Sequence, residues 1–249
     1  MRTFNELKKR AWAANMLLPR HRLVTLTWGN VSELDPARGV FAIKPSGVEY
    51  DDLTPARMVV VNLEGKVVDG DHRPSSDTLS HLELYRLFPQ LGGIVHAHST
   101  HATAFAQAGR DIPCLGTTHA DVFYGAIPVT RPLTRQEIRG CYEKAIGEVI
   151  VECFHKRKLN PEHIPGVLVH AHGPFTWGTD ARHAVENAIV LESVAEMALL
   201  TGCLSGKIRP IAAHLLDKHF LRKHGGNAYY GQNVRPGALP PSLPSRKAR

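Results

Sequence analysis

The chain has 249 residues, of which 43% are hydrophobic and 21% are charged. This length and composition predict a globular protein of one large α/β domain or two small ones. The net charge is +7, but the acid-free tail from Asn233 onward carries much of it, and no basic helix stands out. The sequence therefore argues against a nucleic-acid partner and suits an anionic small substrate.

Nothing in the sequence predicts a membrane span or a secretory signal. The most apolar run, residues 188–200, is interrupted by Glu192 and Glu196 and falls short of the roughly 20 residues that a spanning helix needs. The N-terminal apolar residues are interspersed with basic ones, unlike a signal peptide. The four cysteines form no C-x-x-C pair, so neither a disulfide frame nor a thiolate zinc site is expected. We therefore expect a cytoplasmic protein.

The first part of the chain predicts one helix followed by strands. Helical periodicity, with a capping box of Thr3 and Glu6, predicts a helix over residues 3–19 that Pro19 ends. Three strand-like runs follow, and the last folds back at Glu64–Gly65 as a hairpin. These runs cover residues 23–32, 39–45 and 58–70.

The remainder alternates helices with two apolar strands, at residues 92–99 and 166–178. A second capping box, Thr134 with Glu137, opens a long helix, and Gly202 is expected to end another. The predicted helices cover residues 78–88, 100–109, 134–158, 180–202 and about 210–224. This irregular alternation predicts one layered α/β domain over residues 1–232. The Pro-rich basic segment of residues 233–249 is expected to be disordered.

The strand at residues 92–99 carries His96 and His98 two positions apart. Alternate residues of a strand point to the same face, so both imidazoles could chelate one metal ion. The local alternative is one buried, hydrogen-bonded histidine and one solvated histidine. The strand at residues 166–178 repeats the pattern with His170 and His172, which favours an imidazole-rich pocket. Three neutral imidazoles leave a divalent ion an open position, as in a catalytic site.

Asp77 in "PSSDT" is the candidate carboxylate beside such a metal, although an Asp at a helix start is also a common N-cap. The hydroxyls of Ser75 and Ser76 and the following helix N-terminus could bind an anion. The stretch "KPSG" at residues 44–47 offers a second such set, and either stretch alone is equally compatible with a simple turn.

Six stretches resemble, in order, the L-ribulose-5-phosphate 4-epimerases of the class II aldolase and adducin-like family. The resemblance runs from about residue 4 to residue 232 through "LTWGNVS", "IKPSGV", "PSSDT", "GGIVHAHS", "GTTHAD" and "LLDKHFLRKHG…YYGQ". It implies an α/β/α layered domain around a central, mainly antiparallel sheet. It also implies a homotetramer of cyclic C4 symmetry with active sites at the subunit interfaces.

The same resemblance assigns roles to residues. It implies that His96, His98 and His172 bind zinc, with Asp77 at the carboxylate position beside the metal, although manganese or cobalt would also suit these ligands. His101 and His170 fall outside the ligand positions. Asp121 and Tyr230 match the catalytic acid/base pair, contributed across the interface. The implied positions that bind or support the substrate and its phosphate are Gly29, Asn30, Lys44, Ser46, Gly47, Ser75, Ser76, Thr117, His219 and Arg222.

The reaction implied is the conversion of L-ribulose 5-phosphate to D-xylulose 5-phosphate by inversion at C4. The C4 hydrogen is not acidic, because C4 lies β to the C2 ketone, and the chain has no G-x-G-x-x-G for a nicotinamide. Cleavage of C3–C4 by a retro-aldol step, rotation of the aldehyde and re-addition would invert C4, and a Lewis-acidic metal would stabilise the enediolate. Arabinose or another pentose could supply the substrate.

Three other functions remain open at this point. A class II aldolase would release its aldehyde, but the resemblance implies Glu in aldolases where Asp77 stands. A related sugar-acid-phosphate decarboxylase is the second alternative. The third is an adducin-like scaffold without catalysis, which would have no use for three inward-facing imidazoles.

Overall fold

The computed structural model describes residues 4–226 and 228–230. A seven-stranded sheet lies at its centre in the order β4-β3-β2-β1-β5-β7-β6, and every neighbouring pair is antiparallel. The strands are β1 (Asn30–Asp35), β2 (Val40–Ile43), β3 (Val59–Asn62), β4 (Val67–Asp69), β5 (Gly93–His96), β6 (Gly166–Val169) and β7 (Gly173–Gly178). The expected layered α/β domain with a mainly antiparallel sheet is confirmed.

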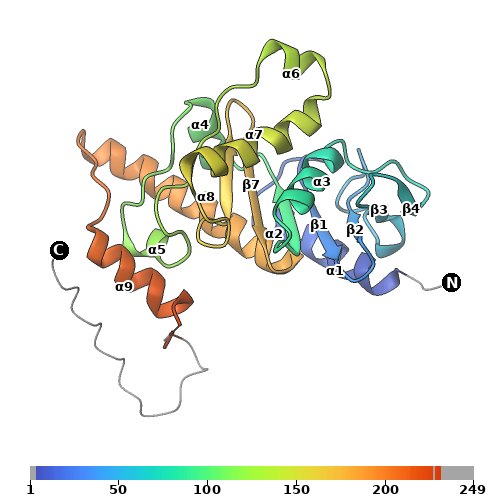
Figure 1. Cartoon of the computed structure of the whole chain (residues 1–249), viewed down its shortest axis with the longest axis horizontal. Helices are drawn as coiled ribbons and strands as arrows, with labels where there is room; N and C mark the ends of the chain where they lie inside the picture. The colour runs from blue at the N-terminus through green and yellow to red at the C-terminus, as the bar shows by residue number, and fades with distance from the viewer. Residues whose placement is uncertain (1–3, 227, 231–249) are drawn as a thin grey trace.

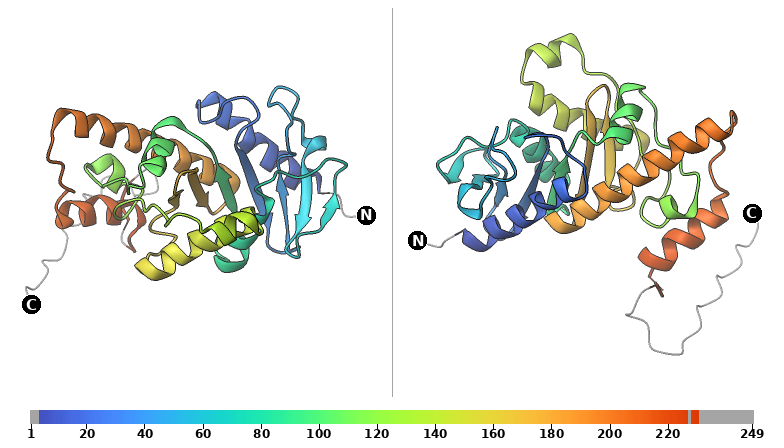
Figure 2. Two further views of the ribbon diagram at one scale, coloured as in Figure 1. Left: turned by 90° about the horizontal axis from the view of Figure 1, so that it is seen from above. Right: turned by 180° about the vertical axis from the view of Figure 1, so that it is seen from behind.

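Helices cover both faces of this sheet (Figures 1 and 2). Helices α3 (Thr78–Leu87) and α7 (Tyr142–Arg157) pack together on one face, while α1 (Asn5–Asn15) and α8 (Ala181–Leu204) lie on the other. The shorter helices are α2 (Leu17–Arg20), α4 (Thr100–Gln107), α5 (Thr117–Ala120), α6 (Arg135–Arg139), α9 (Ala213–His224) and the 3-10 turn η1 (Pro55–Arg57).

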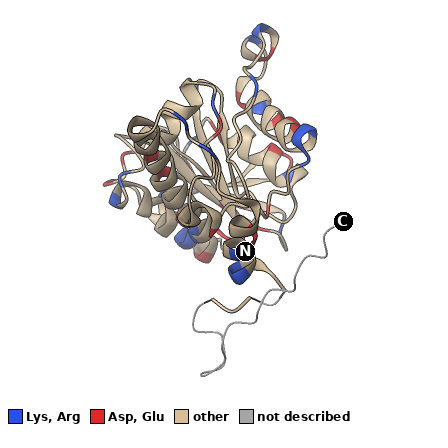
Figure 3. Cartoon of the chain, turned by 90° about the vertical axis from the view of Figure 1, so that its left-hand side faces the viewer, with Lys and Arg blue, Asp and Glu red and all other residues tan. Residues whose placement is uncertain are grey.

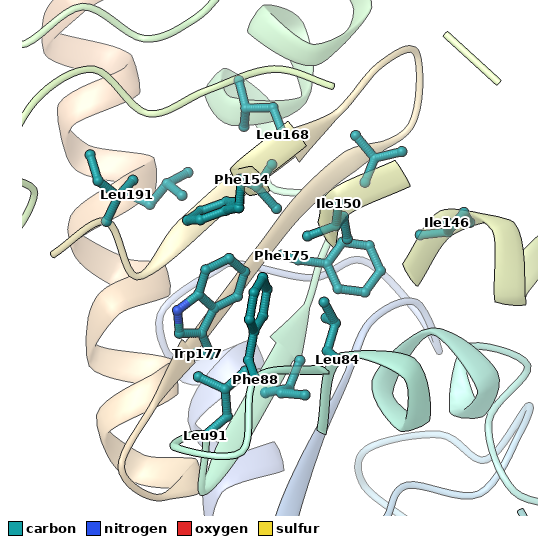
Figure 4. Close-up of a cluster of buried hydrophobic side chains, with 14 of the residues drawn as sticks. Leu84, Phe88, Leu91, Ile146, Ile150, Phe154, Leu168, Phe175, Trp177 and Leu191 are labelled. Atoms are coloured by element: carbon teal, nitrogen blue, oxygen red, sulfur yellow. The ribbon is translucent and has the colours of Figure 1, made fainter. Parts of the chain in front are cut away.

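Strand alternation divides the buried residues between the two faces. Ile94 of β5 belongs to the core under α3 and α7, whereas the next residue, Val95, belongs to the core under α1 and α8. Aromatic residues from several elements fill the first of these cores, among them Phe88, Phe154 and Trp177 (Figure 4). The sheet therefore lies between two packed apolar layers, which fix the positions of its strands and of the residues at their ends.

Several predicted boundaries are wrong for identifiable reasons. The predicted first helix is divided into α1 and α2, and Pro19 lies in the first turn of α2. Proline is tolerated there because a backbone N–H in the first turn would have no acceptor within the helix. The N-cap residue of α1 is Phe4, whose side chain makes no capping hydrogen bond, and the predicted cap Thr3 lies outside the described residues. Residues 23–29 form no strand and include a turn at Leu26 and Thr27, so the strand begins only at Asn30.

The later helices differ in the same way. The capping box of Thr134 and Glu137 is confirmed, but it opens the short helix α6, and a non-helical Gly140 separates α6 from α7. Gly202 lies inside α8, which continues to Leu204 and ends where Ser205 takes an extended conformation. Residues 166–178 form the hairpin of β6 and β7, not one strand. Residues 233–249 lie outside the described part of the chain.

Helix α8 is the one described helix long and apolar enough to cross a membrane by length and composition. It also packs against β5 and β7, and its buried residues, such as Val185 and Leu191, belong to the cores on the sheet. Glu192 accepts hydrogen bonds from the backbone N–H groups of His101 and Ala102. The apolar composition of α8 is thus partly accounted for by core packing.

Basic and acidic residues are interspersed over the described chain (Figure 3). On α7, for example, Lys144 pairs with Glu148 and Lys156 pairs with Glu152. These charges on the outer side of α7 therefore offset one another.

Candidate metal centre and substrate pocket

Three imidazoles converge at one end of the central strands. The Nε2 atom of His96 lies 3.1 Å from the Nε2 atom of His98 and 3.1 Å from that of His172. All three ligand atoms lie within 4.8 Å of one another, close enough to hold one metal ion. The structure thus brings together the three histidines that the resemblance assigned to the metal.

The local geometry differs from the expected strand pair. Strand β5 ends at His96, and His98 follows in the segment before α4, so only His96 belongs to the strand, although the two imidazoles still face the same point. His172 lies in the tight turn between β6 and β7, next to Ala171, whose φ of 56° marks the left-handed region. In a turn, the alternation of side chains that applies to strands is lost.

The other two histidines lie elsewhere, as expected. The ring of His170 packs beside Gly109, where an added Cβ would come 3.0 Å from its Nε2. His101 faces α8, and its Nδ1 lies 2.8 Å from a carboxylate oxygen of Glu192. Neither residue therefore belongs to the group that could hold the ion.

The triad is oriented by its neighbours. Nδ1 of His96 donates a 3.1 Å hydrogen bond to the carbonyl oxygen of Pro174, and its ring stacks on Phe175 with centroids 4.2 Å apart. Nδ1 of His172 lies 3.1 Å from the hydroxyl of Tyr142. With Nδ1 engaged, Nε2 of each ring faces the common point, which is the arrangement of metal-binding histidines.

Burial keeps these imidazoles in the form that binds metals. Burial and the neighbouring His96 lower the pKa of His98 to about 4. Burial, with His96 and His98, lowers the pKa of His172 to about 3. Both rings are therefore neutral at neutral pH, and a set of three imidazole nitrogens fits a divalent ion such as zinc.

Asp77 lies beside the triad, directly before α3. No side-chain hydrogen bond caps the helix there, so the N-cap alternative does not explain this residue. Its Oδ2 accepts a 2.7 Å hydrogen bond from Nδ2 of Asn30 and one of 3.4 Å from the hydroxyl of Ser75. Burial raises the pKa of Asp77, but nearby imidazoles and the Asn30 hydrogen bond outweigh it and hold that pKa below 3.8. The carboxylate is therefore charged at neutral pH.

A pocket of about 500 Å³ opens over these groups. Its lining includes all of the triad, Asp77 and the predicted substrate positions of the first half of the chain. These positions are Gly29, Asn30, Lys44, Ser46, Gly47, Ser75 and Ser76. The volume suits a sugar phosphate.

Glycine is required at one edge of the pocket. Gly29 has a φ of 77°, and an added Cβ would come 2.6 Å from a methyl carbon of Val24 and 3.0 Å from the carbonyl oxygen of His96. Any side chain at this position would therefore displace the end of β5, where the first metal-binding histidine lies.

Lys44 is buried within the pocket wall. Its Nζ donates hydrogen bonds to the carbonyl oxygens of Val48, at 2.7 Å, and Thr27, at 3.3 Å. Burial lowers the pKa of Lys44 to about 8. The ammonium group therefore holds the turn that presents Ser46 and Gly47, and its charge contributes to the pocket.

The remaining predicted residues form a second cluster that does not line this pocket. Asp121 follows α5, which begins at Thr117, and its carboxylate accepts hydrogen bonds of 2.9 Å from His219 and from Arg222. The ring of Tyr230 lies under the guanidinium of Arg222, 4.9 Å from its centroid, and is 57% exposed. One chain therefore keeps the proposed acid/base residues apart from the triad.

The family follows from a comparison with known proteins. The family model described as "Class II Aldolase and Adducin N-terminal domain" matches residues 9–199. The chain belongs to this family. The family expected from the sequence is thereby confirmed. The histidine triad could hold a divalent metal ion of the kind that class II aldolases use.

Solved structures of class II aldolase relatives share the fold. An L-fuculose 1-phosphate aldolase is 22% identical, with a TM-score of 0.69 over 86% of this chain and 94% of that one. YgbL of Klebsiella pneumoniae, assigned in its description to aldolase, epimerase or decarboxylase activity, is 24% identical, with a TM-score of 0.69 over 88% and 99%. YgbL of Escherichia coli is 25% identical, with a TM-score of 0.67 over 86% and 97%.

The sequence analysis missed several residues that line the pocket of this chain. Trp28, Tyr142 and Glu143 line it, and the ring of Trp28 lies 6.1 Å from that of His98. Trp28 stood inside the quoted "LTWGNVS" and could have been found from its place beside Gly29. Tyr142 and Glu143 gave no signal, because they fall inside a stretch that was predicted as uninterrupted helix.

Proposed function

We propose that this chain is a metal-dependent L-ribulose-5-phosphate 4-epimerase, an isomerase that forms D-xylulose 5-phosphate by breaking and re-forming the C3–C4 bond. The observation that carries the proposal is the pocket in which Asp77 lies beside His96, His98 and His172. An aspartate at this position is what the epimerases have, where the aldolases have the longer glutamate. Such an enzyme would act in pentose catabolism, for example of arabinose, in the cytoplasm.

The three histidines would hold the metal, and we propose zinc. When bound, the ion would act as a Lewis acid for the enediolate that C3–C4 cleavage produces. The protein supplies neutral imidazoles through the burial described above, and Asp77 supplies the negative charge next to them. The hydrogen bond from Asn30 fixes the direction in which that carboxylate points.

The opposite side of the pocket would hold the substrate. Oδ1 of Asn30 is buried and has no hydrogen-bond partner among the described residues, which leaves an acceptor for a substrate hydroxyl. Ser46 and Gly47 on one turn and Ser75 and Ser76 on another face the same cavity. We assign these two turns to the phosphate, whose retention would keep the aldehyde fragment in place while it rotates.

The acid/base pair would be completed by assembly. Asp121 and Tyr230 lie outside the pocket of their own chain, which supports a C4 tetramer in which each active site receives them from a neighbouring subunit. Thr117, His219 and Arg222 would accompany them. The C-terminal part of α8 offers an apolar surface for such contacts, formed by Met197, Leu199, Leu200 and Leu204.

A class II aldolase is the second candidate, because an L-fuculose 1-phosphate aldolase shares the fold over most of both chains. The two reactions begin with the same bond cleavage and differ in whether the aldehyde leaves. A panel of ketopentose and ketohexose phosphates, scored for epimerised against cleaved product, separates them. Net release of aldehyde, with no C4 epimer formed, would show that the chain is an aldolase and refute the proposed epimerase function.

A further inference from the structure

Tyr142 is the first residue of α7, and its side chain reaches the metal-binding end of the pocket. The hydroxyl lies 3.1 Å from Nδ1 of His172, and the two rings are parallel, with an interplanar angle of 2° and centroids 6.2 Å apart. This contact joins the start of α7 to the turn between β6 and β7.

The three imidazoles of the triad are not held equally. Nδ1 of His96 donates to a backbone carbonyl, that of Pro174, and the ring of Phe175 supports it. His172 lies in a turn, beside the left-handed Ala171, and its Nδ1 has a side-chain partner instead. The orientation of His172 therefore depends on one hydroxyl that a substitution can remove.

Helix α7 is firmly placed, so it can position this hydroxyl. Arg131 links α6 to α7, because its guanidinium pairs with Glu137 of α6 at 2.7 Å and with Glu152 of α7 at 2.8 Å. Ser80 of α3 donates a 2.6 Å hydrogen bond to the carbonyl oxygen of Glu143. The first turn of α7 is thus anchored next to the residue that carries the contact.

The chemistry of the contact sets its direction. When Nε2 of a neutral imidazole faces a metal, Nδ1 carries the proton, so Nδ1 of His172 would donate to the oxygen of Tyr142.

We propose that Tyr142 is a positioning residue that holds His172 in the tautomer and orientation needed for metal binding. The proposal rests on the metal centre of the proposed function but not on the identity of the sugar. Loss of such an outer partner of a metal-binding histidine typically weakens metal affinity by about 10-fold to 100-fold.

The test is the zinc affinity of Tyr142→Phe, measured by competition with a chromophoric chelator. This variant keeps the ring against His172 and removes only the hydroxyl. Tyr124→Phe is the matched control, because Tyr124 is also partly buried and its hydroxyl donates to Asp217, away from the triad. Thermal unfolding of the metal-free proteins is measured in parallel.

We expect zinc to bind Tyr142→Phe about 10-fold to 100-fold more weakly than the wild type, with the affinity of Tyr124→Phe unchanged. Zinc affinity of Tyr142→Phe within twofold of the wild type would overturn the proposal, whether or not the metal-free variant melts earlier. An equal loss of affinity in both variants would also overturn it. A wild-type protein that binds zinc tightly but epimerises no pentose phosphate would refute the proposed reaction and leave this inference standing.

Discussion

Nδ2 of Asn30 donates a 2.7 Å hydrogen bond to Oδ2 of Asp77, and so connects the first residue of β1 to the residue that precedes α3. The same amide group donates to the hydroxyl of Ser75 at 3.1 Å. With both donors used within the protein, the oxygen of Asn30 is buried and has no hydrogen-bond partner among the described residues, and Asn30 lines the pocket. One amide thereby orients the carboxylate beside the metal site, and under the proposed function its oxygen would be the acceptor for a substrate hydroxyl.

Replacing Asn30 by Ala should therefore impair catalysis more than folding. A hydrogen bond to a charged group contributes about 1.5–3 kcal/mol, so we expect kcat/KM to fall about 10-fold to 100-fold. Steady-state kinetics would measure this. Asn62→Ala is the control, since the Asn62 side chain accepts from Glu64 and Lys66 in the β3–β4 turn. A similar loss of kcat/KM in both variants would contradict the role given to Asn30.

The purified protein should carry about one divalent ion per chain, and His98→Asn should lose most of it while staying folded. The asparagine removes one of three converging nitrogens. His101→Asn should keep the ion, because His101 contacts Glu192 instead. Elemental analysis of the three proteins decides the matter. Metal content in His98→Asn equal to that of the wild type would exclude His98 as a ligand.

Tyr230→Phe should lower turnover by roughly 10²–10⁴, which is the usual contribution of a positioned proton-transfer group. Tyr229→Phe should be much milder. The pair is well matched, because each ring lies near a cation, Tyr229 beside Lys218 and Tyr230 beside Lys223. If kcat falls equally in both variants, this segment serves docking between subunits and carries no specific proton path.

Epimerisation in deuterated water should give D-xylulose 5-phosphate with ordinary hydrogen at C4. If C3–C4 breaks, the C4 hydrogen stays on carbon and travels with the aldehyde fragment. Mass spectrometry or NMR of the product would show this. Added dihydroxyacetone and glycolaldehyde phosphate should also combine slowly on the enzyme. Stoichiometric deuterium at C4 would rule out the retro-aldol route.

Asp121→Asn should destabilise the protein at neutral pH but not in acid. Burial raises the pKa of Asp121, but hydrogen bonds from Arg222, His219 and Lys223 outweigh it and hold that pKa below 3.8. The charged carboxylate thus stabilises the folded chain above pH 3.8, and this contribution is lost as the pH falls through the folded-state pKa.

We expect Asp121→Asn to lose about 1–3 kcal/mol of unfolding free energy at pH 7, with the difference shrinking as the pH falls below 3.8 and through the folded-state pKa. Urea unfolding at pH 7 and at an acid pH measures it. Asp71→Asn, in an exposed bend, is the control and should change little at either pH. A loss in Asp121→Asn that is the same at both pH values would mean that packing, not charge, is responsible.

The layered fold and the three histidines of the triad could be predicted from the sequence. The secondary structure expected to carry the histidines was partly wrong. His96 and His98 were expected on one strand face, yet β5 ends at His96. His172 was expected on a strand and lies in a turn. The motifs identified the residues, whereas the side-chain directions depend on where strand pairing stops, which residue periodicity does not reveal.

Contacts between distant segments were the part that could not be predicted. Tyr142 meets His172 because the helix breaks at Gly140, and that break was hidden in a continuous helical pattern. Asn30 and Asp77 were each predicted, but the hydrogen bond between them required the packing of α3 against the sheet. Such contacts are set by tertiary structure, which the local pattern of a single sequence does not reveal.

The position of β5 in the sheet has a consequence for how the chain folds. His96 pairs with Asn30 of β1 on one side and with Phe175 of β7 on the other, so its strand is completed only by two contacts between distant parts of the sequence. Contacts of this kind form late, because the entropy of closing long loops must be lost first. The unfolded chain thus has no preformed metal centre, and zinc should act mainly by mass action on the native state. We expect it to slow unfolding rather than to speed folding, and to raise the melting temperature with metal concentration.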